Sequence, residues 1–188
     1  MNFFRFTTHT NHAGKDQMKG SARMGILSGN PKEEPLNYAE VLSVWTAVAT
    51  NNGKVAGYQT FINHTGDDDL RKILDDLVQT LKEENKQLER ILKSNGVGLP
   101  PSPPERPIAR LEDIPVGARF MDPEISAAAS MDIAAGLVAC SQAMATSTRE
   151  DIAMLFGQMH MAKAQLGAKL LRLNKAKGWL IPPPLHIV

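Results

Sequence analysis

The chain has 188 residues, of which 43% are hydrophobic and 22% are charged, as in an ordinary globular domain. Its formal charge of +1 lacks the basic excess of a nucleic-acid-binding protein. A single cysteine excludes an internal disulfide framework and a cysteine-rich metal site. The longest uncharged stretch, 133–148, is shorter than the roughly 20 apolar residues of a membrane span, and the N-terminus lacks the apolar segment of a signal peptide. We therefore expect no nucleic-acid partner and no membrane span.

Residues 1–23 differ from the rest of the chain. They show no hydrophobic periodicity and carry four basic residues against one acidic residue. A basic tail could bind an acidic surface. However, the codons for Lys19-Gly20 can form a purine-rich ribosome-binding sequence just before Met24, which favours Met24 as the true first residue. We expect 1–23 to be a disordered N-terminal extension or a start-site artefact, 24–36 an ordered or partly ordered lead-in, and 37–188 the folded domain.

Two helices are predicted next, over 38–64 and from the acidic cluster 67–69 to about 94. Asn37, with Glu40 three positions later, is a capping-box start for the first helix. Gly66 is its expected stop, and Gly53 and Gly57 are expected to let a neighbour approach closely. The short connection predicts an antiparallel hairpin. The expected apolar face of the first helix consists of Tyr38, Trp45, Asn52, Gln59, Val41, Val48, Val55 and Ile62.

Residues 96–121 contain six of the twelve prolines and are predicted to be a stiff crossover. Polyproline II rises about 3.1 Å per residue, so this segment can travel the length of a bundle; docking of its PxxP spacing on an SH3-like partner is the alternative. Asp122 is the expected N-cap of a third helix, and Pro123 is its expected first residue. The expected capping box 147–150 opens a fourth, which Gly178 ends before an extended tail, 179–188. Two antiparallel hairpins joined by a long Pro-rich crossover predict an all-α, ferritin-like four-helix bundle.

Glu84 is the most informative candidate residue, because it stands in the apolar row Leu70, Leu77, Glu84 and Ile91. A buried carboxylate needs a partner. The alternatives are a metal ion, a role as general acid or base, and a structural hydrogen bond. When the two helices are aligned antiparallel about their turn, the Trp45 indole N–H is the nearest donor to Glu84. If the partner is a hydrogen-bond donor of this kind, the protein should tolerate Glu84→Gln.

His160 and Asp132 complete the candidate metal site with Glu84. Each has a structural alternative, as a boundary histidine and an exposed carboxylate, and Asn52 is expected to be a buried amide paired with His160. A di-iron bundle needs about four carboxylates and two histidines. The residues therefore favour a structural protein without a cofactor over a reduced site for iron or another divalent metal. Cys140 is expected to be a small buried residue. The methionines expected to fill the core are Met131, Met144, Met154, Met159 and Met161.

Five stretches carry a resemblance to a known family: MGILSGNPKEEPL (24–36), TNNGKVAGYQTFINHTGD (50–67), SNGVGLPPSPPERP (94–107), PVGARFMDPEIS (115–126) and MAKAQLGAKLLRLNKAKGWLIPPPL (161–185). From 24 to 185 the chain resembles the small ferritin-like proteins of spore-forming Gram-positive bacteria classed as spore coat proteins, distant relatives of the coat protein F group. The resemblance implies a ferritin-like bundle and a place in the sporulating cell's cytoplasm or in the spore coat. It implies no reaction.

The wider ferritin-like pattern is Glu on the first helix, Glu-x-x-His on the second, Glu on the third and Glu-x-x-His on the fourth. This chain departs from it at each helix: Asn52, Glu84 with Gln87, at most Asp132, and Gly157 with His160. The leading expectation is a non-enzymatic structural or assembly protein whose partners are further copies or other coat proteins, with the apolar tail 179–188 as one contact surface. The alternative is a metal-binding or redox bundle, and a third class is a sensor that holds a small apolar ligand in a cavity.

Overall fold

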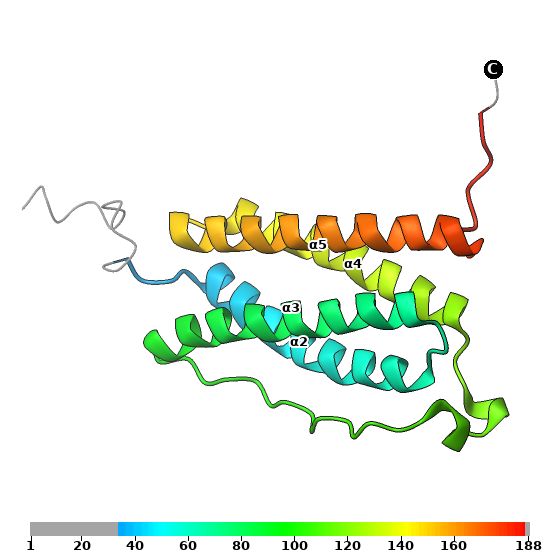
Figure 1. Cartoon of the computed structure of the whole chain (residues 1–188). Coiled ribbons are helices and arrows are strands. Elements are labelled where there is room, and N and C mark those ends of the chain that lie inside the picture. Colours follow the sequence, from blue (N-terminus) through cyan, green and yellow to red (C-terminus); the bar gives the residue numbers. More distant parts are fainter. Residues whose placement is uncertain (1–33, 187–188) are drawn as a thin grey trace, which may run out of the picture. The chain divides into compact units, whose positions relative to one another are not determined.

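The computed structural model describes residues 34–186, which form four long helices, two short 3-10 turns and no strand. Helices α2 and α3 form one hairpin, and α4 and α5 the other (Figure 1). The predicted four-helix bundle of two hairpins is therefore confirmed. Residues 1–23 and 24–33, for which an extension and a lead-in were predicted, lie outside the described residues. The elements are α2 (Tyr38–His64), α3 (Asp68–Ser94), η1 (Leu111–Asp113), η2 (Val116–Ala118), α4 (Asp122–Thr146) and α5 (Glu150–Lys177).

The crossover spans the bundle, so α3 and α4 run parallel. Asp122, the first residue of α4, accepts hydrogen bonds from Thr65 Oγ1 (2.6 Å) and Gly66 N (3.2 Å) beside the start of α3. The crossover leaves α3 at its opposite end, Asn95, and Figure 1 shows it passing along the hairpin of α2 and α3. The predicted parallel arrangement is confirmed.

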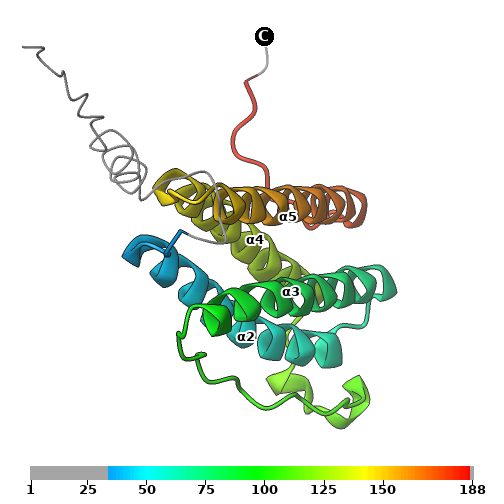
Figure 2. The same ribbon diagram turned by 90° about the vertical axis from the view of Figure 1, so that its left-hand side faces the viewer.

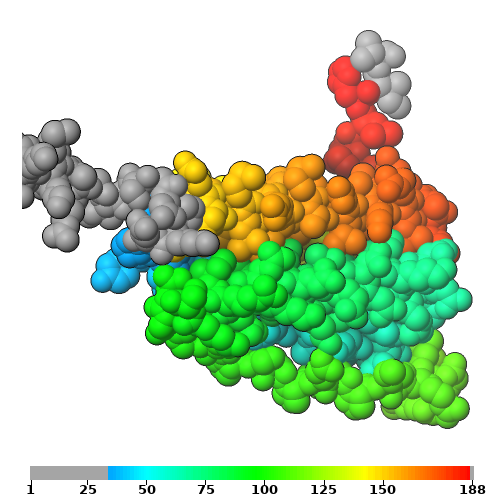
Figure 3. All heavy atoms as spheres, turned by 60° about the vertical axis from the view of Figure 1, so that its left-hand side comes forward, coloured from blue at the N-terminus to red at the C-terminus, as the bar shows by residue number. Residues whose placement is uncertain are grey.

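Polar side chains of α2 hold the crossover in place. Trp45 Nε1 donates to Gly98 O (3.1 Å), and Arg106 N donates to Gln59 Oε1 (2.9 Å). Asn63 bonds to backbone groups further along the crossover through both of its polar atoms (3.0 and 3.1 Å). From Trp45 to Gln59 the helix advances by about 21 Å, and polyproline spacing gives about 25 Å from Gly98 to Arg106. The crossover is thus a strap along the bundle, visible as a ridge in Figure 3.

The first helix begins as predicted, but it ends for another reason. Asn37 Oδ1 accepts from Glu40 N (2.8 Å) and Glu40 Oε2 accepts from Asn37 N (2.8 Å), which completes the capping box. Gly66, the expected left-handed stop, does not have a positive φ; among the described residues only Gly96 and Gly178 do. Instead α2 ends where the Gly66 N–H turns to Asp122.

Both helices of the second hairpin start differently from the prediction. Asp122 is the first helical residue of α4 rather than its cap, because its carboxylate is engaged by the α2–α3 turn. Ser147 does not cap α5, since its hydroxyl donates back to Ala143 O (2.8 Å). Glu40 of α2 does so instead: its Oε1 accepts from Thr148 N (2.7 Å) and Arg149 N (2.8 Å). One buried carboxylate therefore joins the starts of α2 and α5.

The face that α2 turns to the core also differs from the prediction. Val44, Val48 and Tyr58 are buried, whereas Tyr38 is 95% exposed and Trp45 is 37% exposed. The row that contains Tyr38 and Trp45 was wrong, whereas the neighbouring row was right in part, because Val48 is buried and Val55 and Ile62 pack against the core. Helix α2 has apolar or neutral residues on all of its sides, so its periodicity does not single out one face.

Asp67 caps α3 and is also paired with the end of α5. Its Oδ1 accepts from Asp69 N (3.0 Å) and Leu70 N (2.9 Å), and its Oδ2 lies 2.7 Å from Lys177 Nζ. Partial burial alone would raise the pKa of Asp67, but Lys177 and the two backbone donors outweigh it and lower the pKa below the ordinary value of 3.8.

The lowered pKa predicts a pH-dependent contribution to stability. A depressed folded-state pKa gives stability that is present above the unfolded pKa of about 4 and is lost as the pH falls through the folded value. Asp67→Asn keeps a capping oxygen but removes the charge. The variant should therefore be less stable than wild type at pH 7 and equal to it in strong acid, as measured by urea unfolding from pH 7 to pH 2. Asp113→Asn, which removes an exposed ion pair with Arg110, is the control. Equal differences between wild type and Asp67→Asn at all pH values would contradict the prediction.

Candidate functional site

A polar layer divides the core of the bundle into two apolar clusters. One cluster includes Leu81 and Leu166, and the other includes Leu88 and Met159. On α3 every residue between these positions is polar, whereas α5 places the ammonium of Lys163 among smaller and apolar residues, and each helix supplies one residue to the layer. These residues are Asn51 (α2), Glu84 (α3), Gly136 (α4) and Lys163 (α5).

Glu84 is the acceptor at the centre of this layer. Lys163 Nζ donates to Glu84 Oε1, and Asn51 Nδ2 donates to Oε2 (3.1 Å). The side chains are 7% exposed for Glu84 and 12% exposed for Lys163. A Cβ at Gly136 would lie 3.0 Å from the Cδ and Cε atoms of Lys163, so the glycine leaves room for the lysine stem. Both oxygens of the carboxylate are thus engaged, and an ammonium neutralises its charge.

The burial of Glu84 was predicted correctly, and its partners are polar side chains, but the Trp45 indole is not one of them. Trp45 points away from the layer and bonds to Gly98 in the crossover. Lys163 was missed although the sequence holds the same signal as for Glu84: it lies four residues after Met159 and three before Leu166, both buried. Glu84 and Lys163 are opposite charges among the apolar residues of two different helices, and matching them would have identified Lys163 as the partner.

Asn52 forms a second polar contact within the α2–α3 hairpin. Asn85 Nδ2 donates to Asn52 Oδ1 at 2.7 Å, and Asn85 is buried. The predicted pairing of Asn52 with His160 was therefore wrong. The reason is geometric, because Asn52 turns toward α3 and the crossover, whereas His160 lies on α5.

Asp132 has its own lysine. Lys54 Nζ lies 3.6 Å from Asp132 Oδ1 and donates to the Asp132 backbone oxygen (2.9 Å). Burial raises the pKa of Tyr58, and the charge of Asp132 and a hydrogen bond with it raise this pKa further. Asp132 is thus a half-exposed ion-pair partner at the edge of the layer.

The structure does not assemble the candidate metal ligands. Glu84 faces Lys163, Asp132 faces Lys54, and His160 is half-buried elsewhere on α5. Over residues 34–186 no three His, Cys, Asp or Glu side chains come together as a metal-binding group. A lysine ammonium stands at each carboxylate where a metal would have to bind, so this donor set does not fit a metal centre.

The sulfur-containing residues divide between core and surface. Met159 is 5% exposed and Cys140 is buried, as predicted, and burial raises the pKa of the Cys140 thiol. Met131, Met154 and Met161 are 73%, 65% and 59% exposed, so the prediction that they fill the core was wrong. They lie on outward faces of α4 and α5 where the exposed residues, over 127–146 and 152–168, are uncharged, so no charge marks these sides as outer.

A groove of about 350 Å³ opens above the polar layer, between α2 and α4. Figure 2 shows these two helices inclined in the same direction relative to α3 and α5. The groove reaches Glu84, Lys163 and Lys54 at its floor, while its walls are mainly small or apolar. Its volume is in the range of small-ligand pockets. The wall residues include Ala39, Leu42, Ala47, Ala139, Ala143 and Phe156.

Known proteins share both the sequence and the fold. The uncharacterized protein YvdQ of Bacillus subtilis is 58% identical over 164 residues, which are 87% of this chain and 96% of YvdQ. A crystal structure from Bacillus halodurans, titled a "putative spore coat protein", is 64% identical with a TM-score of 0.83, and the match covers 85% of this chain and 100% of that one.

A more distant structure shares the fold alone. The conserved hypothetical protein rv2844 of Mycobacterium tuberculosis is 14% identical, with a TM-score of 0.61 over 79% of this chain and 97% of that one. The family model described as "Protein of unknown function (DUF3231)" matches residues 24–188. The chain therefore belongs to the DUF3231 family.

Proposed function

We propose that the chain is a non-enzymatic structural protein of ferritin-like architecture that belongs to the spore coat. The observation that carries this proposal is the trio of Asn51, Glu84 and Lys163. In ferritin-like di-metal proteins carboxylates and histidines project into the bundle core to hold the metal. Here the buried carboxylate is occupied by an amide and an ammonium, which supports a role in holding the fold.

The similarity to the Bacillus halodurans protein supports the location. The match covers that whole chain at 64% identity, so the description of that protein as a spore coat protein is the basis for proposing a spore-associated role here. The B. subtilis relative is nearly as similar and offers a tractable organism for comparison.

Fractionation of spores tests the location. Coat extracts, decoated spores and the cytoplasm of sporulating cells would be blotted with an antibody against the chain. We expect the protein in the coat extract. Its confinement to the cytoplasm would contradict the proposed role, whatever the assembly state of the purified protein.

Metal analysis tests the non-enzymatic part against the metal-binding alternative. Protein purified without added metal should contain no stoichiometric iron or other divalent metal, and a chelator should leave its melting temperature unchanged. A stoichiometric metal that is lost on Glu84→Gln would instead establish a metal site at this carboxylate.

A further inference from the structure

The side of the bundle formed by α2 and α4 carries one ion pair, between Lys54 and the half-exposed Asp132, and is otherwise uncharged. Every exposed residue of α2 is neutral, and on α4 the exposed residues are neutral from Ala127 to Thr146. By contrast, the exposed residues of α3 are charged except for Gln79, Gln87 and Ser94. We call this surface the α2–α4 face and define it by Leu42, Thr46, Gly53, Met131, Ala135 and Val138.

Helix α4 is more apolar than its burial explains. The segment Val116–Thr146 has a window with mean hydropathy 1.2, enough by length and composition for a membrane span, yet only 33% of that window is buried. A helix that is apolar on all sides is normally covered on all sides. The bundle covers one side of α4, and the α2–α4 face is the side left without a neighbour within residues 34–186.

Gly53 and Gly57 indicate that something approaches this face closely. Within a helix each glycine costs about 0.5–1 kcal/mol relative to alanine. At Gly157 and Gly167 a Cβ would lie 3.4 Å and 3.2 Å from a side chain of the same bundle, but at Gly53 and Gly57 nothing described lies within 4 Å. These two glycines therefore serve no packing contact among residues 34–186.

We propose that a second copy of this chain covers the α2–α4 face. Two copies of a neutral patch can meet without bringing like charges together, which a symmetric dimer requires because each copy presents the same patch. Exposed neutral residues occupy α4 from Ala127 to Ala145, a length of about 27 Å, and two helices are about 20 Å wide. The area is then about 540 Å² per copy, or about 1,100 Å² in total, which passes the lower limit of about 1,000 Å² for a specific interface. The small residues of the face allow the helices of two copies to approach closely.

Pairing also accounts for the groove. The groove lies within this face, with Leu42 on its wall and Lys163 at its floor. In the dimer the partner closes the groove and completes the burial of the polar layer. The biological use of this dimer rests on the proposed structural role, but its existence does not, so spore fractionation and solution mass test the two separately.

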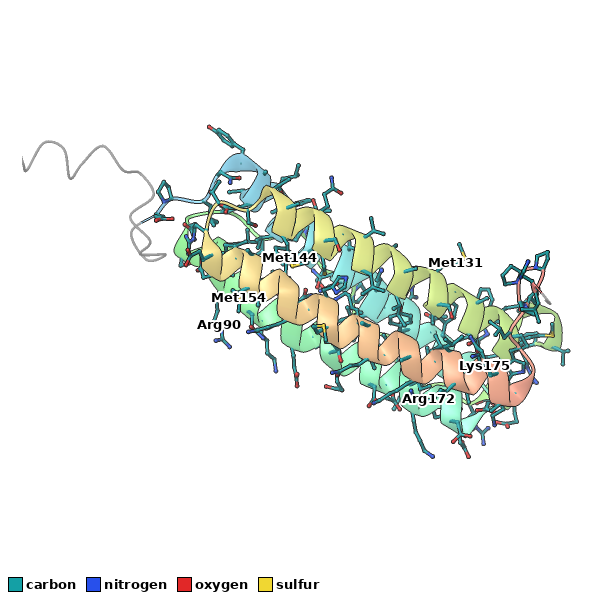
Figure 4. All side chains as sticks on the ribbon, turned by 90° about the horizontal axis from the view of Figure 1, so that it is seen from above. Arg90, Met131, Met144, Met154, Arg172 and Lys175 are labelled. Carbon is teal, nitrogen blue, oxygen red and sulfur yellow. The ribbon has the colours of Figure 1, made fainter. Side chains whose placement is uncertain are left out.

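Analytical ultracentrifugation of the full chain tests the proposal. Wild type should sediment as a dimer at micromolar concentrations, and Leu42→Glu or Met131→Glu should weaken dimerisation by about 100-fold or more, because each places two unpaired carboxylates in one interface. Met154→Glu is the matched control: Met154 is as exposed as Leu42, 65% for each. Figure 4 shows Met131 on the outer side of α4 and Met154 on the other side, near Arg90.

The sedimentation results either support or overturn the α2–α4 face as a dimer interface. Dimeric Met154→Glu beside monomeric Leu42→Glu and Met131→Glu, all with wild-type circular dichroism, supports the interface. A monomeric wild type overturns it, and binding of that monomer to neutral lipid vesicles would assign the face to a membrane surface instead. A dimer that all three variants leave intact would place the contact elsewhere and overturn the proposal equally.

Discussion

Glu84→Gln should lower the free energy of unfolding by about 3 kcal/mol, because removing one partner of a buried ion pair leaves the other charge unpaired. The side chain of Lys163 is only 12% exposed, so water replaces little of the lost interaction. We choose the lower end of the usual range because the lysine borders the groove. The sequence, which suggested a hydrogen-bond donor such as Trp45 as the partner, predicted tolerance of the same substitution. Urea denaturation at pH 7 separates the two expectations.

A double-mutant cycle provides the control. Lys163→Met alone should also destabilise, since it leaves the Glu84 carboxylate with Asn51 as its donor. The double variant Glu84→Gln, Lys163→Met should recover most of the loss, because exchanging both members of a buried pair for neutral groups is often close to neutral. Additive losses, or a Glu84→Gln protein as stable as wild type, would show that the ion pair does not contribute in this way.

Glu40→Ala should cost about 3 kcal/mol, more than the usual loss of a helix cap. The Glu40 carboxylate is 1% exposed and accepts from the backbone N–H groups of Asn37, Thr148 and Arg149. Each buried donor left without an acceptor costs about 1–3 kcal/mol. Water can replace Glu40 at the partly buried N–H groups of Asn37 and Thr148, so the Arg149 N–H bears most of the loss. The measurement is again the free energy of unfolding.

Glu124→Ala is the matched control for this prediction. Glu124 holds the same third position in α4 and accepts from Met121 N at 2.8 Å, but it is exposed and has no role in the other hairpin. Its removal should cost about 1 kcal/mol, as for an ordinary cap. Equal losses for the two variants would contradict the claim that Glu40 joins α2 to α5.

The parts of the fold that depend on neighbouring residues could be predicted from the sequence. The start of α2 follows from the Asn37 capping box, and α3 and α5 end beside Gly96 and Gly178, which have positive φ. The inward face of α3 was also predictable, since most of its outer residues are charged and the row from Leu70 through Leu77 to Ile91 is apolar except at Glu84.

Contacts between the hairpins could not be predicted in the same way. The partner of Glu84 lies 79 positions away on α5, and the donors to Glu40 are more than 100 positions away. Aligning two helices antiparallel about the turn that joins them predicts neighbours only within one hairpin. The inward face of α2 failed for a different reason, because a helix with neutral residues on every side has no periodic signal.

The polar layer also determines how the helices align along the bundle axis. A slide of α5 along α3 by one turn, about 5.4 Å, would exchange apolar contacts for other apolar contacts, because Phe156, Met159, Leu166 and Leu170 are buried at successive turns on either side of Lys163. The same slide would carry the Lys163 ammonium past Glu84 and leave two charges buried without partners. Gly136 on α4 and Asn51 on α2 would then face the wrong side chains as well. One residue per helix therefore selects a single alignment from several that the apolar residues alone would permit.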